Sequence, residues 1–168
     1  MIWSENGHAV VRAAARGLVA AMAMTGTRRV TQNLGLLEQA PPEAIIDEKL
    51  PLTSALSPER REVVIELAHW GYGAAAGAAF GLLSDRVRWH RAAGPAYGLG
   101  IWVVFEVAIA PALGLQYAEE RKAAGRAMLA LDHLLYGVVV AGRLAPERRR
   151  GIPLPPRSSV RRVIRQVA

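Results

Sequence analysis

One stretch of eighteen residues limits what this chain can fold into. Residues 67–84 read LAHWGYGAAAGAAFGLLS and carry no charged side chain except, when protonated, that of His69. A helix on the surface of a water-soluble protein needs a polar face, and a helix that is apolar on all sides lies inside a protein or in lipid. Eighteen residues approach the length that crosses the hydrocarbon layer of a bilayer. The stretch therefore predicts a membrane-spanning helix.

The distribution of charge along the chain extends this prediction to a whole domain. Of the 168 residues, 52% are hydrophobic, and the charged residues gather between four apolar segments. These segments predict spans at about residues 9–30, 62–84, 94–115 and 126–143. We therefore expect an all-α fold, a four-transmembrane-helix bundle that forms one membrane domain over residues 1–145.

Two segments outside these spans have patterns of their own. Pro41 can open a short helix in the first loop, and we expect this helix to lie on the membrane surface or over the mouth of the bundle. Residues 146–168 form a basic, proline-containing tail. The end of the tail has the spacing of an amphipathic helix suited to an anionic membrane surface, and a solvated tail without such a helix is the alternative. The apolar positions of the loop helix are Ala44, Ile45, Ile46 and Leu50.

The chain is strongly basic, with a net charge of +7, and it contains no cysteine. The lack of cysteine excludes disulfides, thiolate chemistry and cysteine-ligated metals. The arginines stand beside the predicted spans, where they mark orientation or bind acidic lipid headgroups, so we expect no nucleic-acid partner. With both termini inside, 13 of the 21 Lys and Arg residues lie on the inner side. The positive-inside rule therefore predicts cytoplasmic termini.

Small residues recur at four-residue spacing on the first two predicted helices. Gly73, Gly77 and Gly81 follow each other on the second helix, and Gly17 belongs to a similar series on the first. In lipid such stripes allow two helix backbones to approach closely. We expect these four glycines to be helix-packing positions.

A short string occurs twice in the chain. His69-x-x-Tyr72-Gly73 returns 64 residues later as His133-x-x-Tyr136-Gly137. Because each copy lies early in a predicted span that follows another span, the repetition predicts two related helical hairpins.

Ionisable residues inside predicted spans are costly and usually face the interior of a bundle. We expect His69, Glu106 and His133 to lie at similar depths. The three side chains together could ligate a divalent metal, and the two imidazoles alone could ligate a haem iron. Proton handling around Glu106 and interhelical hydrogen bonds without any ligand are the other interpretations. The remaining members of the predicted polar cluster are Thr25, Tyr72, Asp132 and Tyr136.

Two further residues, a proline and an arginine, are unfavourable inside membrane-spanning helices. Pro111 cannot donate a hydrogen bond to the carbonyl of Val107, so we expect a kink or a local opening of the helix beside Glu106. Arg16 lies within the first apolar segment, and we expect its side chain to extend towards the nearer interface.

Several short motifs follow one another along the chain. Besides the two His-x-x-Tyr-Gly strings, they are Met24-Thr25, Pro41-Pro42-Glu43-Ala44-Ile45, Gly98-x-Gly100-Ile101-Trp102 and Pro111-Ala112-Leu113-Gly114-Leu115. Their order resembles an uncharacterised family of bacterial four-helix inner-membrane proteins. The resemblance covers about residues 10–143, implies a multi-pass location in the inner (plasma) membrane, and implies no activity.

These observations favour a function without catalysis. The sequence contains no phosphate-binding glycine loop, no His-Glu-x-x-His string and no serine nucleophile elbow. We expect an accessory or scaffold subunit that contacts the lipid bilayer and either another membrane protein or a second copy of itself. The alternatives are a metal- or haem-binding membrane protein and a small proton-coupled transporter.

Overall fold

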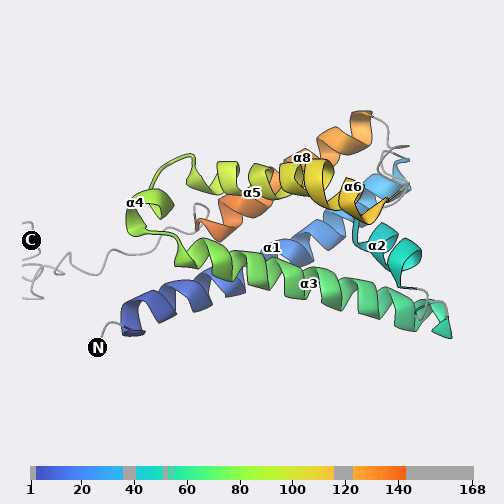
Figure 1. Ribbon diagram of the computed structural model, residues 1–168, viewed down its shortest axis with the longest axis horizontal. Coiled ribbons are helices and arrows are strands. Elements are labelled where there is room, and N and C mark those ends of the chain that lie inside the picture. Colours follow the sequence, from blue (N-terminus) through green and yellow to red (C-terminus); the bar gives the residue numbers. More distant parts are fainter. Residues whose placement is uncertain (1–2, 36–40, 51–52, 54, 116–122, 143–168) are drawn as a thin grey trace, which may run out of the picture.

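The computed structural model describes residues 3–35, 41–50, 53, 55–115 and 123–142 (Figure 1). All regular structure in these ranges is helical, as the sequence predicts. The basic tail lies outside the described residues. The elements are α1 (Trp3–Asn33), α2 (Pro41–Lys49), α3 (Pro58–Leu82), α4 (Asp85–Arg88), α5 (Ala93–Val104), the π-helical turn η2 (Phe105–Ile109), α6 (Ala110–Leu113) and α8 (Ala123–Val140).

The four long segments pack as two antiparallel pairs. Helix α3 lies along α1, and α8 lies along α5, with α1 and α8 in contact between the pairs (Figure 1). A small core forms where the pairs meet, built from Ala20, Phe80, Tyr136 and Val140. The rings of Phe80 and Tyr97 meet edge to face with centroids 5.1 Å apart, so α3 and α5 are also joined.

Three of the described helical segments are long and apolar enough to cross a membrane. They cover Gly7–Asn33, Ala93–Leu113 and Ala123–Val140, and correspond to the first, third and fourth predicted spans. Helix α3 is not among them, although its 25 residues give it sufficient length. Its first turns are rich in charge, and glycine and alanine dominate its second half, so it contains fewer strongly apolar side chains.

The start of α3 follows from local sequence. Ser57 has extended backbone angles and accepts a hydrogen bond from the backbone N–H of Arg60, and Pro58 occupies the first helical position, where its missing N–H costs nothing. A hydrogen bond from its own backbone N–H and one from the Ser57 hydroxyl hold the pKa of the Glu59 carboxyl below its usual value.

The predicted loop helix is present as α2, and it lies across one end of the bundle (Figure 1). Ala44 and Ile46 are buried there, whereas Leu50, expected on the same apolar edge, is exposed. The side chain of Lys49 donates a hydrogen bond to the carbonyl of Gly114. Helix α2 therefore packs against α3 and contacts the end of α6.

The expected opening before Pro111 takes the form of a π-helical turn. The backbone N–H of Ala110 donates to the carbonyl of Phe105, five residues back, over a segment that contains Glu106. The wider turn interrupts the regular α-helical hydrogen-bond pattern just before Pro111, which has no backbone N–H to donate. The helix then ends at Gly114, whose left-handed φ of 58° suits glycine.

Arg16 has a more specific environment than the sequence suggests. Its guanidinium lies against Gly142, where an added Cβ would be 2.5 Å from Nη1. Gly142 follows the C-terminal end of α8, which carries partial negative charge from its last carbonyl groups. The charge of Arg16 is therefore placed at a helix terminus and does not simply extend along α1.

Candidate functional site

Helices α1 and α3 meet along a seam of small residues. A Cβ at Gly73 would lie 2.5 Å from the Cβ of Ala21, and one at Gly81 would lie 2.7 Å from the Cα of Val10. Between them, Gly77 faces the backbone of Gly17. The structure thus brings together the four glycines that the sequence singles out as packing positions, and the two backbones touch directly.

A second seam of the same kind joins α5 to α8. A Cβ at Gly94 would lie 2.5 Å from the carbonyl oxygen of Gly137, and one at Gly98 would lie 2.9 Å from the carbonyl carbon of His133. Sequence reasoning did not assign packing roles to Gly94 and Gly98, although their four-residue spacing is the same signal that marks α3. In both pairs, the glycine of the repeated string, Gly73 or Gly137, contacts the backbone of the preceding long helix.

The tyrosines of the two strings do not have equivalent positions. Tyr136 is 4% exposed and donates a 2.6 Å hydrogen bond to the carbonyl oxygen of Gly73, whereas Tyr72 is 55% exposed. Tyr97 on α5 donates a 2.7 Å hydrogen bond to the carbonyl of Ala76 on α3. Tyr136 and Tyr97 therefore connect the α5–α8 pair to α3.

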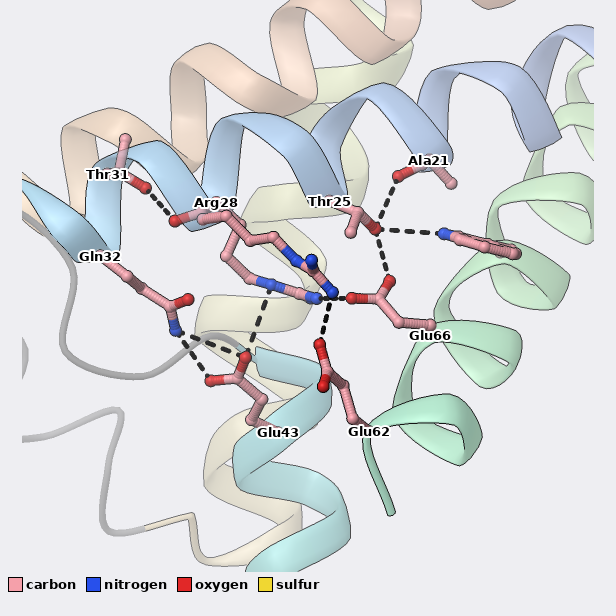
Figure 2. Close-up of polar contacts among 10 residues, drawn as sticks. Ala21, Thr25, Arg28, Thr31, Gln32, Glu43, Glu62 and Glu66 are labelled. Atoms are coloured by element: carbon pink, nitrogen blue, oxygen red, sulfur yellow. Dashed lines mark hydrogen bonds and ion pairs between the residues drawn. The ribbon is translucent and has the colours of Figure 1, made fainter. Parts of the chain in front are cut away.

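A buried ion pair lies at the end of the α1–α3 seam (Figure 2). Nη2 of Arg28 is 2.5 Å from Oε1 of Glu66, and the two side chains are 8% and 10% exposed. The hydroxyl of Thr25 donates to Oε2 of Glu66 at 2.6 Å and accepts a hydrogen bond from the indole N–H of Trp70 at 3.1 Å. Both carboxylate oxygens of Glu66 are thereby used, as a buried charge requires.

Arg28 also pairs with a carboxylate from α2. Its Nε lies 3.5 Å from Oε1 of Glu43, and Glu43 accepts a hydrogen bond from the amide of Gln32 (Figure 2). We call Thr25, Arg28, Glu43, Glu66 and Trp70 the Arg28 cluster. It links α1, α2 and α3, and one guanidinium pairs with carboxylates from two helices. Asp132, which the sequence places in the polar cluster, is buried on α8.

A cleft of about 240 Å³ opens beside the Arg28 cluster. Two ion pairs lie at this cleft. Arg29 pairs with Glu62, and Arg61 pairs with Asp47 of α2. Because arginines and carboxylates both line it, the cleft is suited to polar contacts with α2. The lining residues are Arg28, Arg29, Gln32, Glu43, Pro58, Arg61, Glu62, Ile65 and Glu66.

His69 on α3, Glu106 in η2 and His133 on α8 are each partly buried. Nδ1 of His133 donates to the carbonyl of Leu129 at 2.8 Å, which leaves Nε2 as the acceptor atom of a neutral ring. Nδ1 of His69 is buried and has no hydrogen-bond partner among the described residues. In that part of the chain, no three His, Asp or Glu side chains are grouped as the ligands of a metal ion would be.

The pairing of Arg28 with Glu66 is not among the predictions made from the sequence. A usable signal exists in the glycine seam. Seven residues make about two helical turns, so Arg28 follows Ala21 on the same face of α1, and Glu66 precedes Gly73 on the same face of α3. In an antiparallel seam that places Ala21 against Gly73, the two charged residues must meet.

Comparison with known proteins found no matching family model, no similar curated protein and no similar solved structure. The geometry of the chain itself therefore carries the functional argument.

Proposed function

We propose that this chain is a four-span protein of the bacterial inner membrane that acts as a non-enzymatic accessory or scaffold subunit. The observation that carries the proposal is the closure of both helix pairs by backbone contact at glycine, with long apolar side chains left on the outer faces. Lipid or a neighbouring membrane protein is the natural environment for such faces. Exposed examples are Val103, Val104, Val107, Leu131 and Leu135.

Helix α3 supplies the fourth span in this proposal. It contacts α1 from Gly81, beside Val10, to Glu62, which pairs with Arg29. If α1 crosses the membrane, α3 is held at the same depth over the same length. Its modest hydropathy is compensated because α1 covers its glycine face, and the carboxylate of Glu66 is neutralised by Arg28.

Charges at the two ends of the bundle support the proposed orientation. At the α2 end, the cations of Arg28, Arg29 and Arg61 each pair with a carboxylate. At the other end, Arg86 and Arg91 in the α3–α5 connection are exposed and form no ion pair with any described residue. Counted over the whole chain, 13 of the 21 Lys and Arg residues belong to this side when both termini are inside, which favours its placement in the cytoplasm.

Single cysteines test the four-span arrangement, because the chain contains none. Ser57→Cys and Ser84→Cys stand just before and just after α3. We expect a membrane-impermeant maleimide to label Ser57→Cys from the periplasmic side in intact cells, and Ser84→Cys only after the cells are opened. Labelling of both from one side would show that α3 does not cross the membrane.

The scaffold role rests on the outer face of α5 and η2. Only 11% of the apolar stretch Ala93–Leu113 is buried, less than in the other two candidate spans. We expect a photo-crosslinker introduced at Val107 to capture another membrane protein or a second copy of this chain, and one at the buried position Ala110 to capture neither. A monomer in mild detergent, together with no crosslink from Val107 in native membranes, would overturn the scaffold role.

A second candidate, a cofactor held by His69 and His133, has one specific observation in its favour. The buried Nδ1 of His69 has no hydrogen-bond partner among the described residues, and a buried polar atom of this kind commonly binds a water or a ligand. An absorption spectrum and a metal analysis of protein purified from membranes test it. A haem band or stoichiometric metal that is lost in both His69→Ala and His133→Ala, and kept in Tyr72→Phe, would favour this candidate over the scaffold.

A further inference from the structure

We propose that one end of the bundle is a binding surface for the headgroups of anionic phospholipids. This basic end consists of the start of α1, the connection between α3 and α5 that contains α4, and the end of α8. The inference rests on the membrane embedding proposed above. It adds the class of lipid that the protein recognises and the residues that recognise it.

The three parts of the basic end lie together in the fold (Figure 1). Gly81, near the end of α3, packs against Val10, near the start of α1. The guanidinium of Arg16 lies against Gly142, just beyond the end of α8. Segments far apart in the sequence thus lie at the same end of the fold, which would face a membrane surface if the helices cross the bilayer.

The α3–α5 connection presents cations to that plane. Arg86 and Arg91 are exposed and form no ion pair with any residue that the structure describes. Arg88 is balanced by Asp85. A guanidinium matches the geometry of a phosphodiester and forms two parallel hydrogen bonds with it. These two arginines are therefore suited to phospholipid headgroups.

Apolar side chains beside the arginines distinguish a lipid from a free phosphate. Val87 is 47% exposed and Trp89 is 58% exposed, and both lie between Arg86 and Arg91 in the sequence. Tryptophan prefers the headgroup level of a bilayer, where its ring is in an apolar layer and its N–H reaches water. Cations that flank exposed apolar groups fit a phospholipid at the interface, with its phosphate on the arginines and its glycerol region against Val87 and Trp89.

The end of the fold that contains α2 is less suited to anionic lipids. There, the cations of Arg29 and Arg61 pair with Glu62 and with Asp47 of α2, and the exposed Arg60 stands next to the acidic Glu59 in the sequence. A surface whose charges are already balanced gains little from an anionic lipid. We therefore expect phosphatidylglycerol to collect at the basic end and not around α2.

The test measures lipid binding to the full-length protein in neutral detergent by native mass spectrometry. Titration with phosphatidylglycerol is compared with titration with phosphatidylcholine, for the original chain and for Arg86→Gln/Arg91→Gln. We expect tighter binding of phosphatidylglycerol to the original chain and a weakening of about 30-fold in the double variant. Phosphatidylcholine binding should be unchanged.

Arg29→Gln/Arg60→Gln is the matched control, because it removes two exposed arginines from the other end of the bundle. An equal loss in both double variants would mean that only total charge matters and would overturn the proposal. Equal binding of the two lipids by the original chain would overturn it as well, and so would full competition by inorganic phosphate. Retention of the protein in carbonate-washed membranes tests membrane embedding separately. A failure of the lipid-binding proposal can therefore be distinguished from a failure of the proposed membrane location.

Discussion

The α5–α8 seam predicts opposite outcomes for two glycines that are two residues apart. A Cβ at Gly98 would lie 2.9 Å from the carbonyl carbon of His133 and 3.0 Å from the backbone nitrogen of Gly137. A Cβ at Gly100 would meet nothing within 4 Å. Gly98→Ala and Gly100→Ala therefore add the same methyl group to the same helix, once into a packed backbone and once into open space.

The sizes of the two effects follow from these distances. The atoms facing Gly98 belong to the backbone of α8, so they cannot rotate away, and the helices must separate along the whole seam. Overpacking of this kind costs about 1–3 kcal/mol. Replacement of a helical glycine by alanine gains up to about 1 kcal/mol in a water-exposed helix. We expect Gly98→Ala to destabilise the protein by about 1–2 kcal/mol, and Gly100→Ala to be neutral or slightly stabilising.

The assay is reversible unfolding of the full-length protein in mixed micelles, followed by circular dichroism. The midpoint for Gly98→Ala should shift towards lower denaturant, with that for Gly100→Ala unchanged or higher. Equal shifts in the same direction would refute the reasoning, because the two positions would then not differ in how closely α8 approaches them.

Three further predictions concern the polar contacts and one helix end. Glu66→Ala should lower the free energy of unfolding by about 3–5 kcal/mol, because it leaves the Arg28 guanidinium buried without its main partner. Adding Arg28→Met to the same chain should recover most of this loss, and additive costs in a double-mutant cycle would contradict the prediction. Tyr136→Phe should cost about 1 kcal/mol by removing the hydrogen bond to the α3 backbone, whereas Tyr72→Phe should leave the thermal midpoint unchanged, and similar shifts would be inconsistent with the structure. Gly142→Ala should lower the thermal midpoint by the equivalent of about 1–2 kcal/mol because its φ of 71° is left-handed, and an unchanged midpoint would argue against this helix end.

Properties that depend on neighbours within a few turns could be predicted from the sequence. The helical class, the start of α3 at Ser57 and Pro58, the loop helix at Pro41 and the opening before Pro111 all depend on local spacing, capping or a missing donor. The glycine series of α3 lies on the face that approaches α1, because a helical face is fixed by the period of 3.6 residues.

Properties that depend on how two distant helices meet required the tertiary structure. The repeated His-x-x-Tyr-Gly strings share the same residues at the same spacing, yet their tyrosines differ. Tyr136 is buried and hydrogen-bonds to Gly73 in the α1–α3 seam, whereas Tyr72 is exposed. Arg28 and Glu66 stand 38 residues apart, and their contact exists only because the glycine seam fixes the register of the two antiparallel helices. Local periodicity thus determined what each helix is and which face it packs with, and the long-range register, which depends on the shapes of both partners together, decided which charged and aromatic groups became neighbours.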